Sequence, residues 1–340
     1  MYALRKTLLG FASLASLAAL QANAATLVPI TPPAGAASAI VFGINKHNVI
    51  AGEYVDGNGL EHGFIGPLNG TYTIFDYGGT STATEPRAIN DDGDVNGFAL
   101  DPSFTIGEQF LRKADGTVLT LEKNGVPLDG IAQGITKKRT SSTGDYVDPN
   151  TGTITGYTAQ NGAYKSDVDL GLTVTRTSPR AINKFGTLAG FYLDSGGASH
   201  GFILKNGIAQ VVDADGSGTT SLEGINKKGL ATGFVADADG NRHAFIYDSA
   251  KGEFTSIEIP DGSPFTETWG INDQGMIGTS TAVGTYIYCI RDVHCPDGGT
   301  AIADGRTWKA KPGASLRYDG NGRTGVKAPK GQRPARRPLQ

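Results

Sequence analysis

Short apolar segments alternate with turns rich in Gly, Asn and Asp along most of the chain, a pattern that predicts β-strands rather than helices. One region, residues 181–213, reads AINKFGTLAGFYLDSGGASHGFILKNGIAQVVD. We expect a neighbouring backbone to approach closely at Gly190, because Gly within a strand often marks such a contact. The region predicts four short strands, at residues 180–183, 187–193, 200–204 and 208–212.

The opening element of this region recurs along the chain. Gly or Ala, then Ile, then Asn or Thr, occurs six times at spacings of 43 to 47 residues, with isoleucines at Ile44, Ile89, Ile135, Ile182, Ile225 and Ile271. Four antiparallel strands in about 45 residues are typical of a β-propeller blade. The sequence therefore predicts an all-β propeller of six four-stranded blades, or seven if residues 301–318 build a partial blade.

Two parts of the chain modify this repeat. Residues 25–30 match a fourth strand, so we expect the N-terminal strand to complete the last blade and close the ring. In the third repeat, residues 137–150 are interpreted as an insertion before residues 152–156.

A short motif also recurs in the third strand of three repeats. His is followed by Gly or Ala and then Phe at His62, His200 and His243. Together with the Gly-Ile-Asn element and the glycines of the second strand, this pattern resembles the HAF-type repeats of bacterial extracellular proteins, over residues 40–280. The resemblance implies export and a propeller fold, and it implies no particular activity.

Composition divides the chain into three parts. Residues 1–24 have a positive start, an apolar middle and an Ala-Asn-Ala end, as secretory signal peptides do. Residues 25–305 are the expected propeller, with 18 basic and 32 acidic residues, and residues 306–340 form a tail with ten Lys or Arg and one acidic residue. We expect a secreted or periplasmic protein whose tail is largely disordered. Such a tail could bind anionic lipid, polysaccharide or nucleic acid, but a solvated end is the simpler interpretation.

The repeats also indicate candidate binding residues. Positions that the blade fixes should repeat, whereas positions that it leaves free can diverge. The first strand of a blade lines the propeller axis, so the residues two places before each isoleucine should ring one mouth of the channel. They are Phe42, Arg87, Gln133, Arg180, Glu223 and Trp269.

The chemistry of three of these residues suits an acidic saccharide. The guanidinium groups of Arg87 and Arg180 can fork onto a carboxylate or sulfate, and the indole of Trp269 can stack on a sugar. The alternative is that both arginines are solvated residues at the entry of their strands.

Each of the other candidate motifs has both a functional and a purely structural interpretation. Two loops place carboxylates at alternate positions, as calcium loops do, although ordinary hairpin turns have the same composition: Asp213, Asp215, Asp237 and Asp239. Cys289 and Cys295 predict a disulfide, with a metal site that includes His294 as the alternative. Ser199 lies in a Gly-x-Ser-x-Gly match between two expected strands, where a nucleophile elbow needs a helix. The repeated histidines are interpreted as structural.

Two classes of function stay open. The first is a binding or scaffold module for a glycan or an extracellular protein. The second is an enzyme that processes extracellular polysaccharide as a lyase or glycoside hydrolase. The first is favoured because spacing reveals no nucleophile–base pair. We expect no cofactor apart from the calcium noted above, no nucleic-acid partner and a monomer.

The tail generates the first testable prediction. Deleting residues 320–340 should leave the melting temperature of the secreted chain nearly unchanged, because this polar segment buries little apolar surface. Thermal denaturation of the two proteins measures the effect. A large drop would mean that the tail docks on the propeller.

Overall fold

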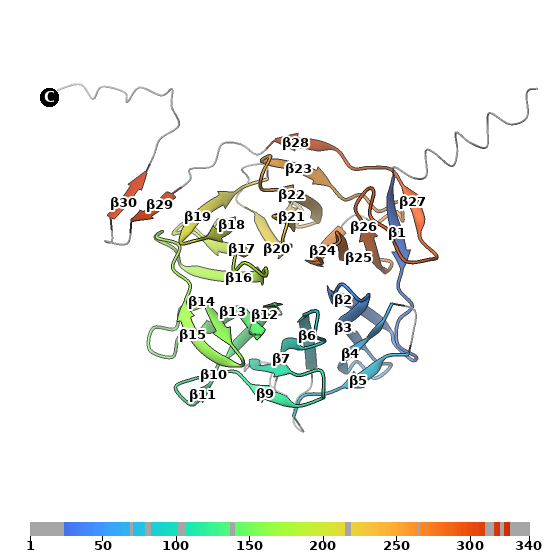
Figure 1. Ribbon diagram of the computed structural model, residues 1–340, viewed down its shortest axis with the longest axis horizontal. Coiled ribbons are helices and arrows are strands. Elements are labelled where there is room, and N and C mark those ends of the chain that lie inside the picture. Colours follow the sequence, from blue (N-terminus) through green and yellow to red (C-terminus); the bar gives the residue numbers. More distant parts are fainter. Residues whose placement is uncertain are drawn as a thin grey trace, which may run out of the picture.

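The computed structural model describes residues 24–68, 71–78, 83–100, 107–136, 140–214, 219–263, 266–309, 316–319 and 323–326. These ranges contain β-strands and no α-helix, so none of them holds a helix that could span a membrane. The strands are arranged radially about a central axis, as in a propeller (Figure 1). The innermost strands are β2 (Ser38–Ile44), β6 (Ala83–Ile89), β12 (Gly130–Thr136), β16 (Arg176–Ile182), β20 (Thr220–Ile225) and β24 (Thr266–Ile271).

Each innermost strand pairs antiparallel with the strand that follows it, and the pairing continues outward. The second strands are β3 (Val49–Val55), β7 (Val95–Leu100), β13 (Ser141–Val147), β17 (Leu188–Leu193), β21 (Leu230–Ala236) and β25 (Met276–Thr281). The third strands are β4 (Glu61–Pro67), β8 (Gly107–Arg112), β14 (Ile154–Gln160), β18 (Ser199–Lys205), β22 (Arg242–Asp248) and β26 (Thr285–Cys289). Within residues 181–213, the second, third and fourth strands lie where the pattern predicts them.

The fourth strands lie at the rim. Five follow their unit directly: β5 (Thr73–Phe75), β9 (Val118–Thr120), β15 (Ala163–Asp167), β19 (Ile208–Val212) and β23 (Glu253–Ser256). The sixth place is taken by β1 (Ala25–Pro29), which pairs antiparallel with β26. The predicted position of the N-terminal strand in the last unit is therefore confirmed. The Cys289–Cys295 disulfide at the end of β26 is confirmed as well.

The interpretation of residues 137–150 as an insertion is wrong. Ser141–Val147 is the second strand of the third unit, and it pairs with β12 on one side and β14 on the other. Gly144 is the second-strand glycine of this unit. A Cβ added there would lie 2.2 Å from the carbonyl oxygen of Ile131 on the first strand, as a Cβ at Gly52 would lie 2.0 Å from that of Ile40. The unit therefore keeps the repeat geometry, with a short β10 (Glu122–Lys123) and β11 (Val126–Pro127) added before it.

Residues 300–309 run along the outside of the last two sheets, beyond β1 and β23 (Figure 1). β27 (Thr300–Ile302) pairs with β1, and β28 (Thr307–Lys309) pairs with β23. Trp308 stacks on Phe254 with ring centroids 5.2 Å apart, and its indole donates a hydrogen bond to the carbonyl of Ala214. The start of the segment expected to be a disordered tail is thus part of a sheet. Further along the same segment, β29 (Leu316–Asp319) and β30 (Arg323–Val326) pair with each other as a separate hairpin. Residues 1–23 of the expected signal peptide and residues 327–340 lie outside the described ranges.

The small residue before each repeated isoleucine lets neighbouring inner strands approach each other at the axis. A Cβ added at Gly134 would lie 2.7 Å from the Cα of Ala181, and one at Gly270 would lie 2.8 Å from the carbonyl oxygen of Phe42. The second contact joins the last unit to the first. The expected close approach at Gly190 is also found, since a Cβ there would lie 2.2 Å from a backbone oxygen of β16.

The asparagine after the isoleucine holds two turns at once. Asn226 Oδ1 accepts hydrogen bonds from the backbone N–H groups of Lys228 and Leu230, and its Nδ2 donates to the carbonyl of Asn272 at 3.2 Å. Asn272 Nδ2 donates in turn to the carbonyl of Asn45, 227 residues away in the sequence. All these asparagines are buried. The same bond between turns recurs from Asn45 to Asn90 and from Asn183 to Asn226.

This arrangement predicts a stability effect. Asn226→Ala removes the acceptor of two backbone N–H groups in its turn and one of the two donors to the Asn272 carbonyl, which keeps the bond from the Gly275 N–H. Because an unsatisfied buried polar group costs about 1–3 kcal/mol, we expect the free energy of unfolding to fall by at least that amount. Urea denaturation measures the difference.

The matched control is Asn58→Ala, because Asn58 is exposed and its amide hydrogen-bonds only to Asp56 in its own turn. Asn226→Asp should lie between the two variants, since it keeps the acceptor and loses the donor. Equal stability of the Asn226→Ala and Asn58→Ala proteins would show that the bonds between turns do not stabilise the fold.

Candidate functional site

A β-bulge interrupts the pairing of the first and second strands in every unit. In the first unit, Val41 pairs with Gly52 and Gly43 pairs with Ala51, so Phe42 is the extra residue. A bulge of this kind re-aims a side chain out of the regular pleat. The shift recurs at the equivalent place in the other five units. The residues at these bulges are Phe42, Arg87, Gln133, Arg180, Glu223 and Trp269, which we call the channel ring.

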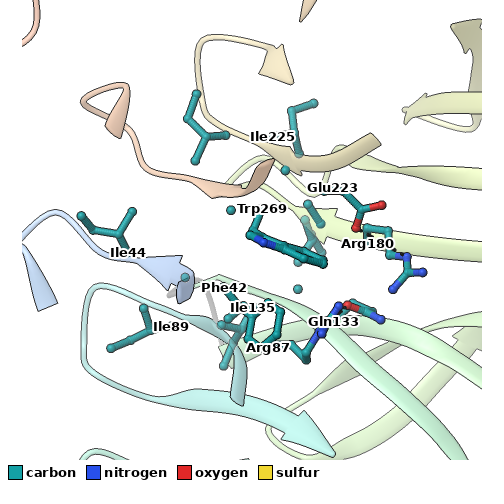
Figure 2. Close-up of a pocket in the computed structure, with 18 residues that line it drawn as sticks. Phe42, Ile44, Arg87, Ile89, Gln133, Ile135, Arg180, Glu223, Ile225 and Trp269 are labelled. Atoms are coloured by element: carbon teal, nitrogen blue, oxygen red, sulfur yellow. Dashed lines mark hydrogen bonds and ion pairs between the residues drawn. The ribbon is translucent and has the colours of Figure 1, made fainter. Parts of the chain in front are cut away.

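The channel ring lines one cavity of about 80 Å³ on the central axis (Figure 2). The structure therefore brings together all six residues that the repeat singled out. A cavity of ~150 Å³ is enough to hold a benzene molecule. The space inside the channel ring is about half of that, so it can admit the edge of a ligand but not a whole sugar ring.

Two of the three guanidinium nitrogens of Arg87 are already hydrogen-bonded within the protein. Its guanidinium lies over the ring of Phe42 at 4.0 Å and near that of Trp269 at 5.0 Å. Its Nε donates to Gln133 Oε1 at 3.2 Å, and its Nη1 donates to Glu85 Oε2 at 3.0 Å. The side chain is 10% exposed. Arg87 therefore stabilises the aromatic side of the channel ring, and it is not a solvated residue.

The other side of the channel ring holds polar groups with unused hydrogen-bonding capacity. Glu223 Oε1 accepts a hydrogen bond from Ser221, while Glu223 Oε2 lies 3.7 Å from Arg180 Nε, beyond hydrogen-bond distance. Gln133 Nε2 and Arg180 Nε are buried and have no hydrogen-bond partner among the residues that the structure describes. Gln133 is 5% exposed and Glu223 is 8% exposed. All three side chains line the same small cavity.

Glu85, which binds Arg87, belongs to a cluster of three carboxyl groups that the sequence did not reveal. Oxygens of Glu53, Glu61 and Glu85 lie within 4.8 Å of one another. Burial raises the pKa of Glu53 to about 8, and the charge of Glu85 adds to this shift. Burial also raises the pKa of Glu85, against the opposing effect of Arg87.

Such a set of oxygens is the beginning of a hard-cation site. Here, however, Glu85 is bound by Arg87, and Glu53 is mainly protonated at neutral pH.

The repeated histidines bind carboxylates of the loops at the rim. His200 Nδ1 lies 3.0 Å from Asp213 Oδ1, and its Nε2 lies 3.4 Å from Asp194 Oδ2. His243 Nε2 lies 2.9 Å from Asp237 Oδ2, and His62 has the same kind of contact with its own loop. The histidines therefore connect a loop to a strand end, which agrees with a structural role.

Two of the four calcium candidates are thus hydrogen-bonded to histidines. Asp237 also accepts hydrogen bonds from the backbone N–H groups of Asp239 and Asn241. These bonds, with that from His243 as the largest cause, lower the pKa of Asp237 to about 2. Asp215 lies outside the described residues. Calcium binding at these loops stays a prediction.

Ser199 begins β18, and its hydroxyl donates to the carbonyl of Thr220, so the Gly-x-Ser-x-Gly match lies between strands.

No family model and no curated protein matches this chain. Solved structures with a similar arrangement include TolB from Acinetobacter baumannii, at 13% identity and a TM-score of 0.48, covering 67% of this chain and 61% of TolB. Aleuria aurantia lectin in complex with α-methyl-L-fucoside is similar at 10% identity and a TM-score of 0.43, covering 81% of this chain and 97% of the lectin. A streptogramin B lyase is similar at 9% identity and a TM-score of 0.40, covering 78% of this chain and 97% of the lyase. At these values the likenesses carry no argument about function.

The acid cluster generates a pH-dependent prediction. Glu53 ionises near pH 4.5 in the unfolded chain and near pH 8 in the fold. The stabilisation from keeping it protonated is therefore complete below pH 4.5 and is lost as the pH rises through about 8. Glu53→Gln cannot ionise, so we expect it to melt above wild type at pH 8, by about 2–4 °C for each kcal/mol gained, and to match it near pH 4.5.

Thermal melts at the two pH values measure this difference. The control is Glu122→Gln, which removes an exposed carboxylate from β10 and should leave the pH dependence unchanged. If Glu53→Gln loses stability between pH 4.5 and 8 as steeply as wild type does, Glu53 is not the group responsible.

Proposed function

We propose that this protein is an exported six-bladed β-propeller that acts as a binding module for a glycan or an extracellular protein. The observation that carries the proposal is the convergence of six bulged side chains on one cavity, including buried donors without a partner. Buried polar groups in folded proteins almost always have a partner, so the unpartnered donors of two residues that line one cavity favour a ligand there.

The contrast between repeating and non-repeating positions supports this role. The flanking small residues, isoleucines and asparagines recur because they build the blade. The bulge positions carry two aromatic rings, two guanidiniums, an amide and a carboxylate, so the blade does not dictate their chemistry. The six-blade count is supported by the contribution of one residue from each unit, and by the bond from Asn272 to Asn45.

Export is supported by the signal-like residues 1–24 and by the Cys289–Cys295 disulfide, which fits an oxidising compartment. The partner is therefore expected outside the cytoplasm.

Glycan processing by the channel ring is the weaker alternative. Glycoside hydrolysis ordinarily uses two carboxyl groups that flank the scissile bond. Of the residues that line the cavity, Glu223 alone carries a carboxylate, and the volume does not admit a sugar ring. A binding role needs neither a second carboxylate nor a bond held inside the cavity.

The test is a comparison of ligand sets. Mature protein (residues 25–340) and its Arg180→Ala variant are screened on a glycan array and on immobilised extracellular proteins. We expect Arg180→Ala to lose at least tenfold in affinity for the wild-type ligand, because hydrogen bonds to charged groups contribute about 1.5–3 kcal/mol. Arg306→Ala is the control, since it removes one exposed positive charge outside the cavity. A folded Arg180→Ala protein that binds every wild-type ligand equally well would contradict the proposal.

A further inference from the structure

We infer that the group that enters the channel ring is a pair of hydroxyls on a neutral sugar, rather than the carboxylate or sulfate of an acidic one. This inference rests on the proposed function, because it names the ligand class of the same cavity. It changes the expectation that both guanidinium groups grip an acidic ligand, since Arg87 is already bonded to Glu85 and Gln133.

The charge of the cavity is balanced before any ligand arrives. The positive charge of Arg87 is paired with Glu85 through a 3.0 Å hydrogen bond. The positive charge of Arg180 faces Glu223, with Nε and Oε2 3.7 Å apart. An acidic ligand would place a further negative charge beside a buried Glu223, and like charges in a desolvated site repel strongly. A neutral ligand meets no such penalty.

The unused polar atoms offer both donors and an acceptor. Gln133 Nε2 and Arg180 Nε can donate, and Glu223 Oε2 can accept. A hydroxyl both donates and accepts, so two neighbouring hydroxyls satisfy all three atoms. A carboxylate only accepts, and it would leave Glu223 Oε2 without a hydrogen-bond donor.

Size and neighbouring surface agree with a sugar edge. The cavity of about 80 Å³ has room for two hydroxyl groups, while the remainder of the sugar stays outside. Trp269 is partly exposed at the cavity, and its indole is held by a hydrogen bond to Ser280 and by edge contact with Phe42. A fixed indole beside hydroxyl-binding groups favours a sugar, whose C–H faces pack on aromatic rings, over a peptide amide. Figure 2 shows Trp269, Gln133 and Arg180 among the side chains that line the cavity.

The test uses matched neutral and acidic probes. Methyl glycosides of galactose and glucose, and the corresponding galacturonide and glucuronide, are titrated calorimetrically into mature protein. We expect at least one neutral glycoside to bind, and its uronide to bind at least tenfold more weakly. Glu223→Gln should weaken the neutral glycoside roughly tenfold, because it replaces a charged acceptor by a neutral one. The same variant should leave the uronide unchanged or tighten it, because the repulsive charge is gone.

Each outcome decides one point. A uronide that binds more tightly than its neutral partner overturns the inference and leaves the proposed binding function standing. If no probe binds with a Kd below roughly 10 mM, the inference is overturned, and the binding function is decided by the Arg180→Ala comparison instead. Should Glu223→Gln fail to fold, the neutral-to-acidic comparison on wild type still decides between the two ligand classes. Arg306→Ala serves again as the control for lost charge.

Discussion

The side-chain amide of the repeated asparagine joins neighbouring turns at four of the six boundaries between the described units, and the radial arrangement depends on these bonds. One end satisfies backbone N–H groups of its own turn, and the other donates to the carbonyl of the next turn. Because the group is buried, its geometry is costly to change. The bond from Asn272 to Asn45 joins segments that are 227 residues apart, so the same local chemistry links neighbours in sequence and neighbours only in space.

The bulged residue three positions before this asparagine can change without a change in the backbone of the blade. In a regular strand, the residue before the small one would have to fit the pleat and the packing between sheets. As an extra residue it is outside the ladder, so Phe42 and Glu223 occupy equivalent positions without disturbing the strands. The scaffold can therefore keep a constant backbone while the cavity changes polarity from one unit to another.

Much of the fold could be predicted from the repeat. The strands of residues 187–212 and the position of β1 follow from alternation and spacing, because both are local or periodic. The second strand of the third unit was missed because its polar residues hide the alternation, although Gly144 marks it. β28 was assigned to the tail because it is short and lies within a basic stretch; Trp308 was the one apolar signal.

The candidate site could be predicted only as a set of residues. Spacing identifies which six side chains meet, because the period fixes their place on the inner strand. It does not reveal that Arg87 is held by Glu85 and Gln133, since that depends on contacts between units and on the direction of each bulged side chain. The same holds for Glu53, whose pKa is raised first by burial and then by the charge of Glu85 on a strand of the neighbouring unit.

The pairing of β1 with β26 constrains the order in which the chain can fold. β1 waits for a partner some 260 residues later in the sequence, and Thr26 lies opposite Cys289 in that pairing. Contacts of such long range slow folding and leave strand edges open in the meantime. The last sheet is therefore completed only when the C-terminal unit is present, so a truncated or stalled chain would carry both β1 and the first unit without their neighbours. The appearance of β26 therefore sets the earliest moment at which this sheet can be completed.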